Sequence, residues 1–84
     1  MKIKFFVKQN CPNCPPAKKL AEKLINDKVN VEVFDLGTTE GLTESVFHCI
    51  MSTPTVILAD DKNEEIKSWR GQAPQEEELR QLLK

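Results

Sequence analysis

The sequence has no excess of charge of either sign and no long apolar run. Twelve basic and thirteen acidic residues leave a formal net charge of −1 at pH 7. No basic stripe with interleaved aromatic side chains is present, so nucleic acid is not an expected partner. No apolar segment approaches the length of a membrane span, and the first residues lack the apolar core and cleavage site of a signal peptide. We therefore expect a cytoplasmic protein that does not contact a membrane.

Cysteine is also scarce, and its count is odd. The chain has 84 residues, enough for a single domain spanning residues 1–84, and three of them are cysteines. A secreted module that is stapled by disulfides usually has more cysteines, in an even number. In a reducing compartment, two cysteines close in sequence are more often catalytic or metal-binding than structural. This directs attention to Cys11 and Cys14.

Periodic apolar patterns predict seven elements in the order βαβαββα, the first three forming a parallel βαβ unit. Strands are expected over 2–8, 29–36, 55–59 and 64–70. In the first, Lys2, Lys4 and Lys8 lie on one face. The first helix is expected to bury a regularly spaced stripe made of Ala17, Leu20, Ala21, Leu24 and Ile25.

The two later helices show shorter apolar stripes. After a loop over 37–41, the second helix is expected to bury Leu42, Val46, Cys49 and Ile50. Phe47 and Met51 are expected to be core residues, or else an apolar rim on which partner proteins dock. The last helix begins near Pro74 and buries Leu79, Leu82 and Leu83. Trp69 either packs under this helix or borders the site.

The segment that carries chemistry is Cys11-Pro12-Asn13-Cys14, at a strand-to-helix junction. This location predicts Cys11 at the helix N-cap, where free N–H groups and the positive helix end favour the thiolate, the attacking species in disulfide exchange. Cys14 lies one turn further and is expected to resolve the mixed disulfide. Pro12 stands where a missing N–H costs nothing. Pro15 and Pro16 predict an irregular first turn, with regular helix from about Pro15.

A metal-binding interpretation of the same cysteines is also open. Cys11 and Cys14 could be half of a zinc site, completed nominally by His48 and Cys49. Adjacent helix residues point about a quarter-turn apart, so we expect no metal here. His48 is then expected to be a solvated surface residue. Cys49 is expected to be a small buried side chain, or alternatively a regulatory thiol near Pro54.

The segment from Lys8 to Cys14 resembles the glutaredoxin active site, where a basic residue stands three positions before a CPxC motif. Thr53-Pro54-Thr55 resembles the loop with a cis-proline that faces the redox pair in the thioredoxin/glutaredoxin superfamily. The resemblance covers the whole chain in element order. It implies an α/β minimal thioredoxin fold with a four-stranded mixed sheet of order 2-1-3-4 and helices on both faces.

The resemblance also implies roles for residues near the pair. Pro54 should lie against Cys11 and Cys14, and the Thr53 backbone should hydrogen-bond a cysteine-containing partner as an added strand does. Lys8 either holds Cys11 as thiolate or binds a substrate carboxylate, unless it is simply solvated. Asp35 could pair with Lys8 or accept a proton from Cys14.

The expected reductant is inferred from a departure of this sequence from the glutaredoxin pattern. Glutathione-using glutaredoxins carry Gly-Gly and an acidic residue after the third strand, where this chain reads Asp60-Asp61-Lys62-Asn63-Glu64. The segment from Trp69 to Pro74 is more like thioredoxins and the small redoxins that reduce ribonucleotide reductase. We therefore expect a monomeric thiol–disulfide oxidoreductase with no cofactor beyond its cysteine pair. It would reduce a client protein, for which the resemblance suggests ribonucleotide reductase, and be reduced by a thioredoxin-reductase-type enzyme. The alternatives are a glutathione-dependent glutaredoxin and, in another class, a zinc- or cluster-binding interaction module.

Overall fold

The computed structural model describes residues 1–83 and confirms the expected order of elements. The strands are β1 (Lys2–Val7), β2 (Val31–Asp35), β3 (Thr55–Ala59) and β4 (Glu65–Arg70). The helices are α1 (Cys14–Asn26), α2 (Thr39–Phe47) and α3 (Glu76–Leu82). The sheet has the order β2-β1-β3-β4, with β1 parallel to β2 and antiparallel to β3, as predicted. No helix within residues 1–83 is both long and apolar enough to cross a membrane.

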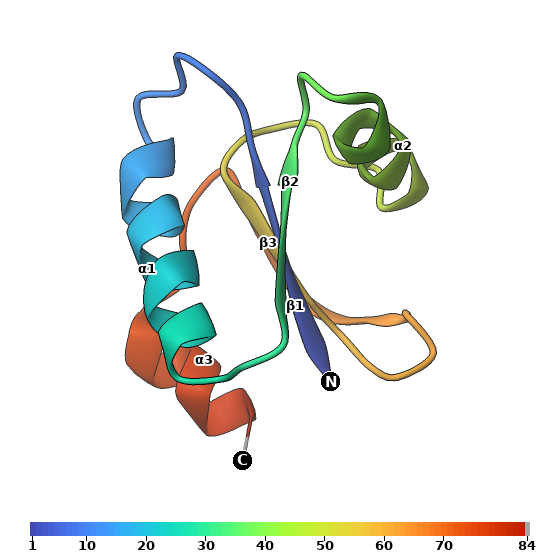
Figure 1. The fold of residues 1–84 in the computed structure, drawn as a ribbon. Coiled ribbons are helices and arrows are strands. Elements are labelled where there is room, and N and C mark those ends of the chain that lie inside the picture. The colour runs from blue at the N-terminus through green and yellow to red at the C-terminus, as the bar shows by residue number, and fades with distance from the viewer. Residues whose placement is uncertain (84) are drawn as a thin grey trace.

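The helices cover both faces of this sheet (Figure 1). On one face, α1 and α3 lie over a core that includes Ile3, Phe5, Leu24 and Leu79. Trp69 belongs to this core, and its Nε1 donates to Glu78 of α3 at 2.7 Å, so it packs under the last helix. On the other face, α2 lies over a smaller cluster. The central strands are therefore buried on both sides, which is why Phe6 interrupts the alternation of β1.

The first helix is close to its predicted form. Ala17, Leu20, Ala21 and Leu24 are buried, but Ile25 is about half exposed. Ile25 lies at the edge of the buried stripe and next to the end of the helix, so its side chain reaches solvent. Leu82 and Leu83 are partly buried against the same core.

The second helix contradicts the expected orientation. Leu42, Val46, Phe47 and Met51 are exposed, so neither the predicted buried stripe nor the core assignment of Phe47 and Met51 is correct. Ile50 alone among the predicted residues packs partly against the sheet. The helix buries Gly41 and Ser45 instead, and His48 follows at its C-terminal end.

The close approach of α2 to the sheet explains this choice. A Cβ at position 41 would lie 2.6 Å from the carbonyl carbon of Asp35, at the end of β2. No side chain fits at position 41 at that separation, so the helix turns Gly41 to the sheet and its apolar residues outward. The helix also begins at Thr39, inside the predicted loop, because the Thr38 hydroxyl caps it by accepting from the Gly41 N–H at 3.0 Å.

Candidate active site

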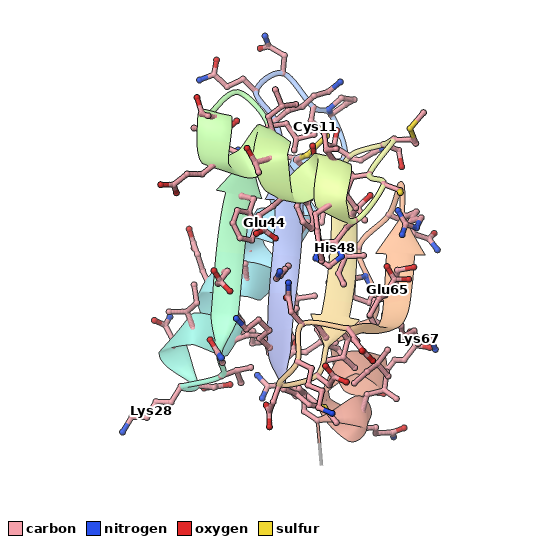
Figure 2. The ribbon with its side chains drawn as sticks, turned by 90° about the vertical axis from the view of Figure 1, so that its right-hand side faces the viewer. Cys11, Lys28, Glu44, His48, Glu65 and Lys67 are labelled. Atoms are coloured by element: carbon pink, nitrogen blue, oxygen red, sulfur yellow. A yellow bond between two sulfur atoms is a disulfide. The ribbon has the colours of Figure 1, made fainter. Side chains whose placement is uncertain are left out.

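Cys11 and Cys14 lie where β1 ends, at the same edge of the sheet as the end of β2, and they are joined by a disulfide with a Cα–Cα distance of 5.4 Å. Figure 2 shows Cys11 at this edge. Asn10, with a left-handed φ of 61°, turns the chain out of β1 toward the motif. Cys14 is almost fully buried, whereas Cys11 keeps 9 % of its surface exposed. Cys11 is therefore the sulfur that an incoming disulfide can reach more readily.

The N-cap of α1 differs from the prediction, whereas the start of the helix agrees with the regular helix expected from about Pro15. Asn13 is the N-cap and Cys14 is the first helical residue, so Cys11 is not the N-cap. Pro15 and Pro16 occupy the first turn, where N–H groups have no helical partner and proline is tolerated. The irregular start that these prolines predict is confirmed. The Cys14 N–H donates to the Cys11 carbonyl at 3.3 Å, which folds the motif into a turn preceding the helix.

The loop before β3 contacts the pair from the other side. The Thr53–Pro54 peptide bond is cis, and Pro54 is fully buried. The Thr53 hydroxyl lies 3.5 Å from Cys11 Sγ, in position to donate to it. Next to it, the Thr55 hydroxyl donates to the Ser52 carbonyl at 2.7 Å, which fixes the loop. A hydroxyl donor thus faces the more accessible sulfur.

Lys8 and Asp35 border a groove beside the motif, together with Gln9, Leu36, Gly37 and Thr38. They do not form an ion pair with each other, and within residues 1–83 Lys8 has no carboxylate partner. Asp35 Oδ1 instead accepts from the Gly37 N–H at 2.7 Å. Asp35 therefore has a structural contact in the turn that leads to α2.

Two expectations about the residues after α2 are wrong. His48 is not solvated but 6 % exposed, and Cys49 is not buried but exposed, in a left-handed conformation with φ 57°. Both differences follow from the orientation of α2. Once Gly41 and Ser45 face the sheet, His48 continues that face at the i+3 position and Cys49 turns away from it. Among the described residues, no three His, Cys, Asp or Glu side chains gather as a metal site.

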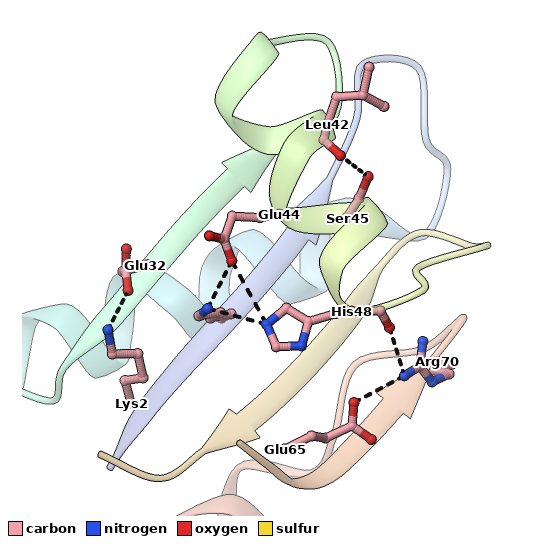
Figure 3. Close-up of polar contacts among 9 residues, drawn as sticks. Lys2, Glu32, Leu42, Glu44, Ser45, His48, Glu65 and Arg70 are labelled. Atoms are coloured by element: carbon pink, nitrogen blue, oxygen red, sulfur yellow. Dashed lines mark hydrogen bonds and ion pairs between the residues drawn. The ribbon is translucent and has the colours of Figure 1, made fainter. Parts of the chain in front are cut away.

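Behind this region lies a buried polar cluster that the sequence patterns did not predict. Lys4, in the middle of β1, is 2 % exposed, and its Nζ lies 2.8 Å from Glu44 Oε2 and 3.2 Å from His48 Nε2. Figure 3 shows the contacts of Glu44 and His48 over the sheet. Burial and the Lys4 charge lower the pKa of His48. The position of Lys4 could have indicated this cluster. It lies in the middle of the first strand of the predicted βαβ unit, and such a strand is usually covered on both faces.

Comparison with known proteins places these features in a family. A model of a thioredoxin domain matches residues 1–84. A thioredoxin of Methanocaldococcus jannaschii is 32 % identical over 62 residues, 73 % of each chain. A probable thioredoxin of Archaeoglobus fulgidus is 30 % identical over 83 residues, covering 98 % of this chain and 85 % of that protein. The solved structure of thioredoxin 1 from Thermosipho africanus superposes with a TM-score of 0.69 at 25 % identity, over 99 % of this chain and 90 % of that one.

The fold of this chain agrees with that solved structure, and the chain itself carries a cysteine pair joined as a disulfide after β1. A cysteine pair that can open and close as a disulfide is the chemical requirement for thiol–disulfide exchange. The chain therefore belongs to the thioredoxin family and is a thiol–disulfide oxidoreductase.

Proposed function

We propose that this protein reduces disulfides in client proteins through a two-step dithiol mechanism. The Cys11 thiolate attacks a client disulfide, forms a mixed disulfide and releases the first client sulfur as a thiolate. Cys14, deprotonated, then attacks Cys11 Sγ, releases the second client sulfur and closes the Cys11–Cys14 disulfide. Two electrons pass to the client, and a reductant must return them. The observation that carries this proposal is the greater exposure of Cys11 beside the Thr53 hydroxyl.

Thr53 and Pro54 would support the attacking sulfur. The Thr53 hydroxyl, 3.5 Å from Cys11 Sγ, can donate to the thiolate after the disulfide opens. The backbone of Thr53 would then hold the client segment in an extended pairing. Pro12 has no N–H, so it leaves no unpaired donor in the turn between the two cysteines. Lys8 would attract a carboxylate of the bound partner, since it has no ion pair within the described chain.

The partner that suits this surface is a protein. Exposed apolar side chains on α2 and after it, among them Val46, Phe47 and Met51, offer apolar contact area, and Met51 lies two residues before Thr53. Met51 is 93 % exposed. Apolar area of this kind is a common feature of protein docking sites. A cytoplasmic client such as ribonucleotide reductase is compatible with it, and a reducing compartment would sustain the cycle.

The physiological reductant is proposed to be a thioredoxin-reductase-type enzyme and not glutathione. This choice rests on the segment Asp60-Asp61-Lys62-Asn63-Glu64, which forms the turn before β4 and has no Gly-Gly. The test offers oxidised protein either NADPH with thioredoxin reductase or glutathione alone. Intact mass then follows the gain of two hydrogens. Fast reduction by the enzyme with glutathione ineffective is expected. Fast reduction by glutathione would instead identify a glutathione-dependent glutaredoxin.

A further inference from the structure

The cluster of Lys4, Glu44 and His48 links the centre of the sheet to the end of α2. Lys4 projects from β1, Glu44 lies in the second half of α2, and His48 is the C-cap of that helix. Lys4 Nζ contacts both partners, and Glu44 Oε2 lies 3.8 Å from His48 Nε2 (Figure 3). Lys4 and His48 are both buried, so water replaces none of these contacts readily.

The geometry fixes the protonation state of His48. A lysine ammonium has three N–H donors and no acceptor, so at 3.2 Å the Nε2 atom must accept. His48 is therefore neutral, with its proton on Nδ1. A proton added at Nε2 would turn the contact with Lys4 into two opposed donors. Two buried cations would then share the single carboxylate of Glu44.

The other groups around His48 do not reverse this effect. From β4, Glu65 favours the protonated form, and Arg70 opposes it. From β1 and α2, Lys4 opposes the protonated form and Glu44 favours it, while burial opposes it most strongly. The rings of Phe6 and Phe47 contact the imidazole edge-on and add no charge beside it. The net direction is a lowered pKa.

The position of His48 connects this cluster to the cysteine pair. The segment 49–52 runs from His48 to Thr53, whose hydroxyl contacts Cys11. Arg70 holds the start of that segment by donating to the carbonyls of His48 and Cys49, at 3.2 and 3.1 Å. The Ile50 N–H donates to the Ser45 carbonyl at 2.8 Å. A change at the end of α2 therefore has a short covalent path to the active site.

We propose that Lys4, Glu44 and His48 form a proton-sensitive latch, which holds the end of α2 and the segment leading to Thr53 on the sheet. Uptake of one proton at His48 breaks its contact with Lys4 and loosens this part of the molecule. Acidification below neutral pH thus opens the latch, while the β1–β3 core stays closed.

The experiment uses the fact that His48 is the only histidine in the chain. In tag-free oxidised protein, NMR follows the imidazole from pH 8 to pH 5, and amide hydrogen exchange is measured at both ends of this range. We expect a titration midpoint below the ordinary 6.5. Protection of the His48 and Ile50 amides, corrected for intrinsic exchange, should fall relative to β1 and β3 amides. The loss should be about tenfold for each pH unit that the midpoint lies below 6.5.

Two variants control the interpretation. His48→Gln keeps a side-chain oxygen that can accept from Lys4 but cannot take up a proton, so protection at these amides should no longer depend on pH. Lys4→Met removes the opposing ammonium and should move the His48 midpoint upward. A wild-type midpoint at or above 6.5 would overturn the latch, and so would pH-independent protection in the wild type. If His48→Gln does not fold, the wild-type titration and its exchange data still decide the question.

Discussion

Gly41→Ala should destabilise the protein, although the same change in most helices is stabilising. Alanine is favoured over glycine in a helix interior by about 1 kcal/mol. At position 41, however, the added methyl would lie 2.6 Å from the carbonyl carbon of Asp35 and nearer still to its oxygen. That oxygen also accepts from the Thr38 N–H and hydroxyl, at 3.0 and 2.8 Å, so the backbone there is held firmly. The helix must move away from the sheet.

The expected size follows from two opposing contributions. Overpacking a close contact costs about 1–3 kcal/mol, and displacement of α2 also disturbs the Lys4–Glu44 contact. The approach to the Asp35 backbone is severe, so we place the combined cost at the upper end of this range, about 3 kcal/mol; after the gain of about 1 kcal/mol in helix propensity, the expected net loss is about 2 kcal/mol. For a domain of this size, such a loss lowers the melting temperature by roughly 10 °C.

Thermal unfolding of the reduced protein measures this effect, and Thr43→Ala provides the matched control. Thr43 lies on the exposed side of the same helix, where its hydroxyl donates to the Thr39 carbonyl and, within residues 1–83, to no other group. Its replacement should change the melting temperature by less than about 3 °C. A Gly41→Ala protein as stable as the wild type, or more stable, would refute the close approach of α2 to the end of β2.

Two further predictions concern the core and the site. Leu24→Ala should lower the free energy of unfolding in urea by about 2–5 kcal/mol, because Leu24 is fully buried. The neighbouring Ile25 is half exposed, so Ile25→Ala should cost less than about 1.5 kcal/mol. Equal losses would contradict the face assigned to α1. Thr53→Val removes the hydroxyl near Cys11, a contact of about 1 kcal/mol at 3.5 Å. It should therefore lower the acid dissociation constant of the reduced Cys11 thiol about fivefold, as measured by the pH dependence of alkylation. Thr53→Ser should keep the wild-type profile, and an unchanged Thr53→Val would show that the hydroxyl does not support the sulfur.

The stability of the protein should also depend on pH through His48. The pKa of His48 is lowered in the folded state, so the unfolded chain binds the proton more readily. The stabilisation is present above the unfolded value of about 6.5 and is lost as pH falls toward the lower folded value. Unfolding curves of wild type and His48→Gln between pH 8 and pH 5 measure the difference. Parallel pH dependence in the two proteins would contradict it.

Much of the fold followed from the sequence because most elements obey simple patterns. Strand β3 is a continuous apolar run, as a central strand should be, and α1 has a regular apolar stripe. The cysteine motif was located at a strand-to-helix junction, and the prolines after it gave the irregular helix start. These features depend on local chemistry, which the sequence displays directly.

The orientation of α2 could not be predicted because it depends on a distance between elements. An apolar stripe normally marks the buried face of a helix. Here the helix buries Gly41 and Ser45 instead, because the Asp35 carbonyl leaves no room for a side chain at position 41. The burial of His48 and the exposure of Cys49 both follow from that one packing choice. The contact of the Thr53 hydroxyl with Cys11, 42 residues earlier, is likewise a product of the tertiary fold.

The most direct test of the account traps the intermediate on Cys11. Reduced Cys14→Ser protein is mixed with a peptide that contains a disulfide, and the adduct is located by intact mass and peptide mapping. Because Cys14 is then absent, the mixed disulfide should accumulate on Cys11, and Cys11→Ser protein should form none and show no turnover. An adduct that forms on Cys49 instead of Cys11, or retained turnover in Cys11→Ser, would contradict the assignment of Cys11 as the nucleophile.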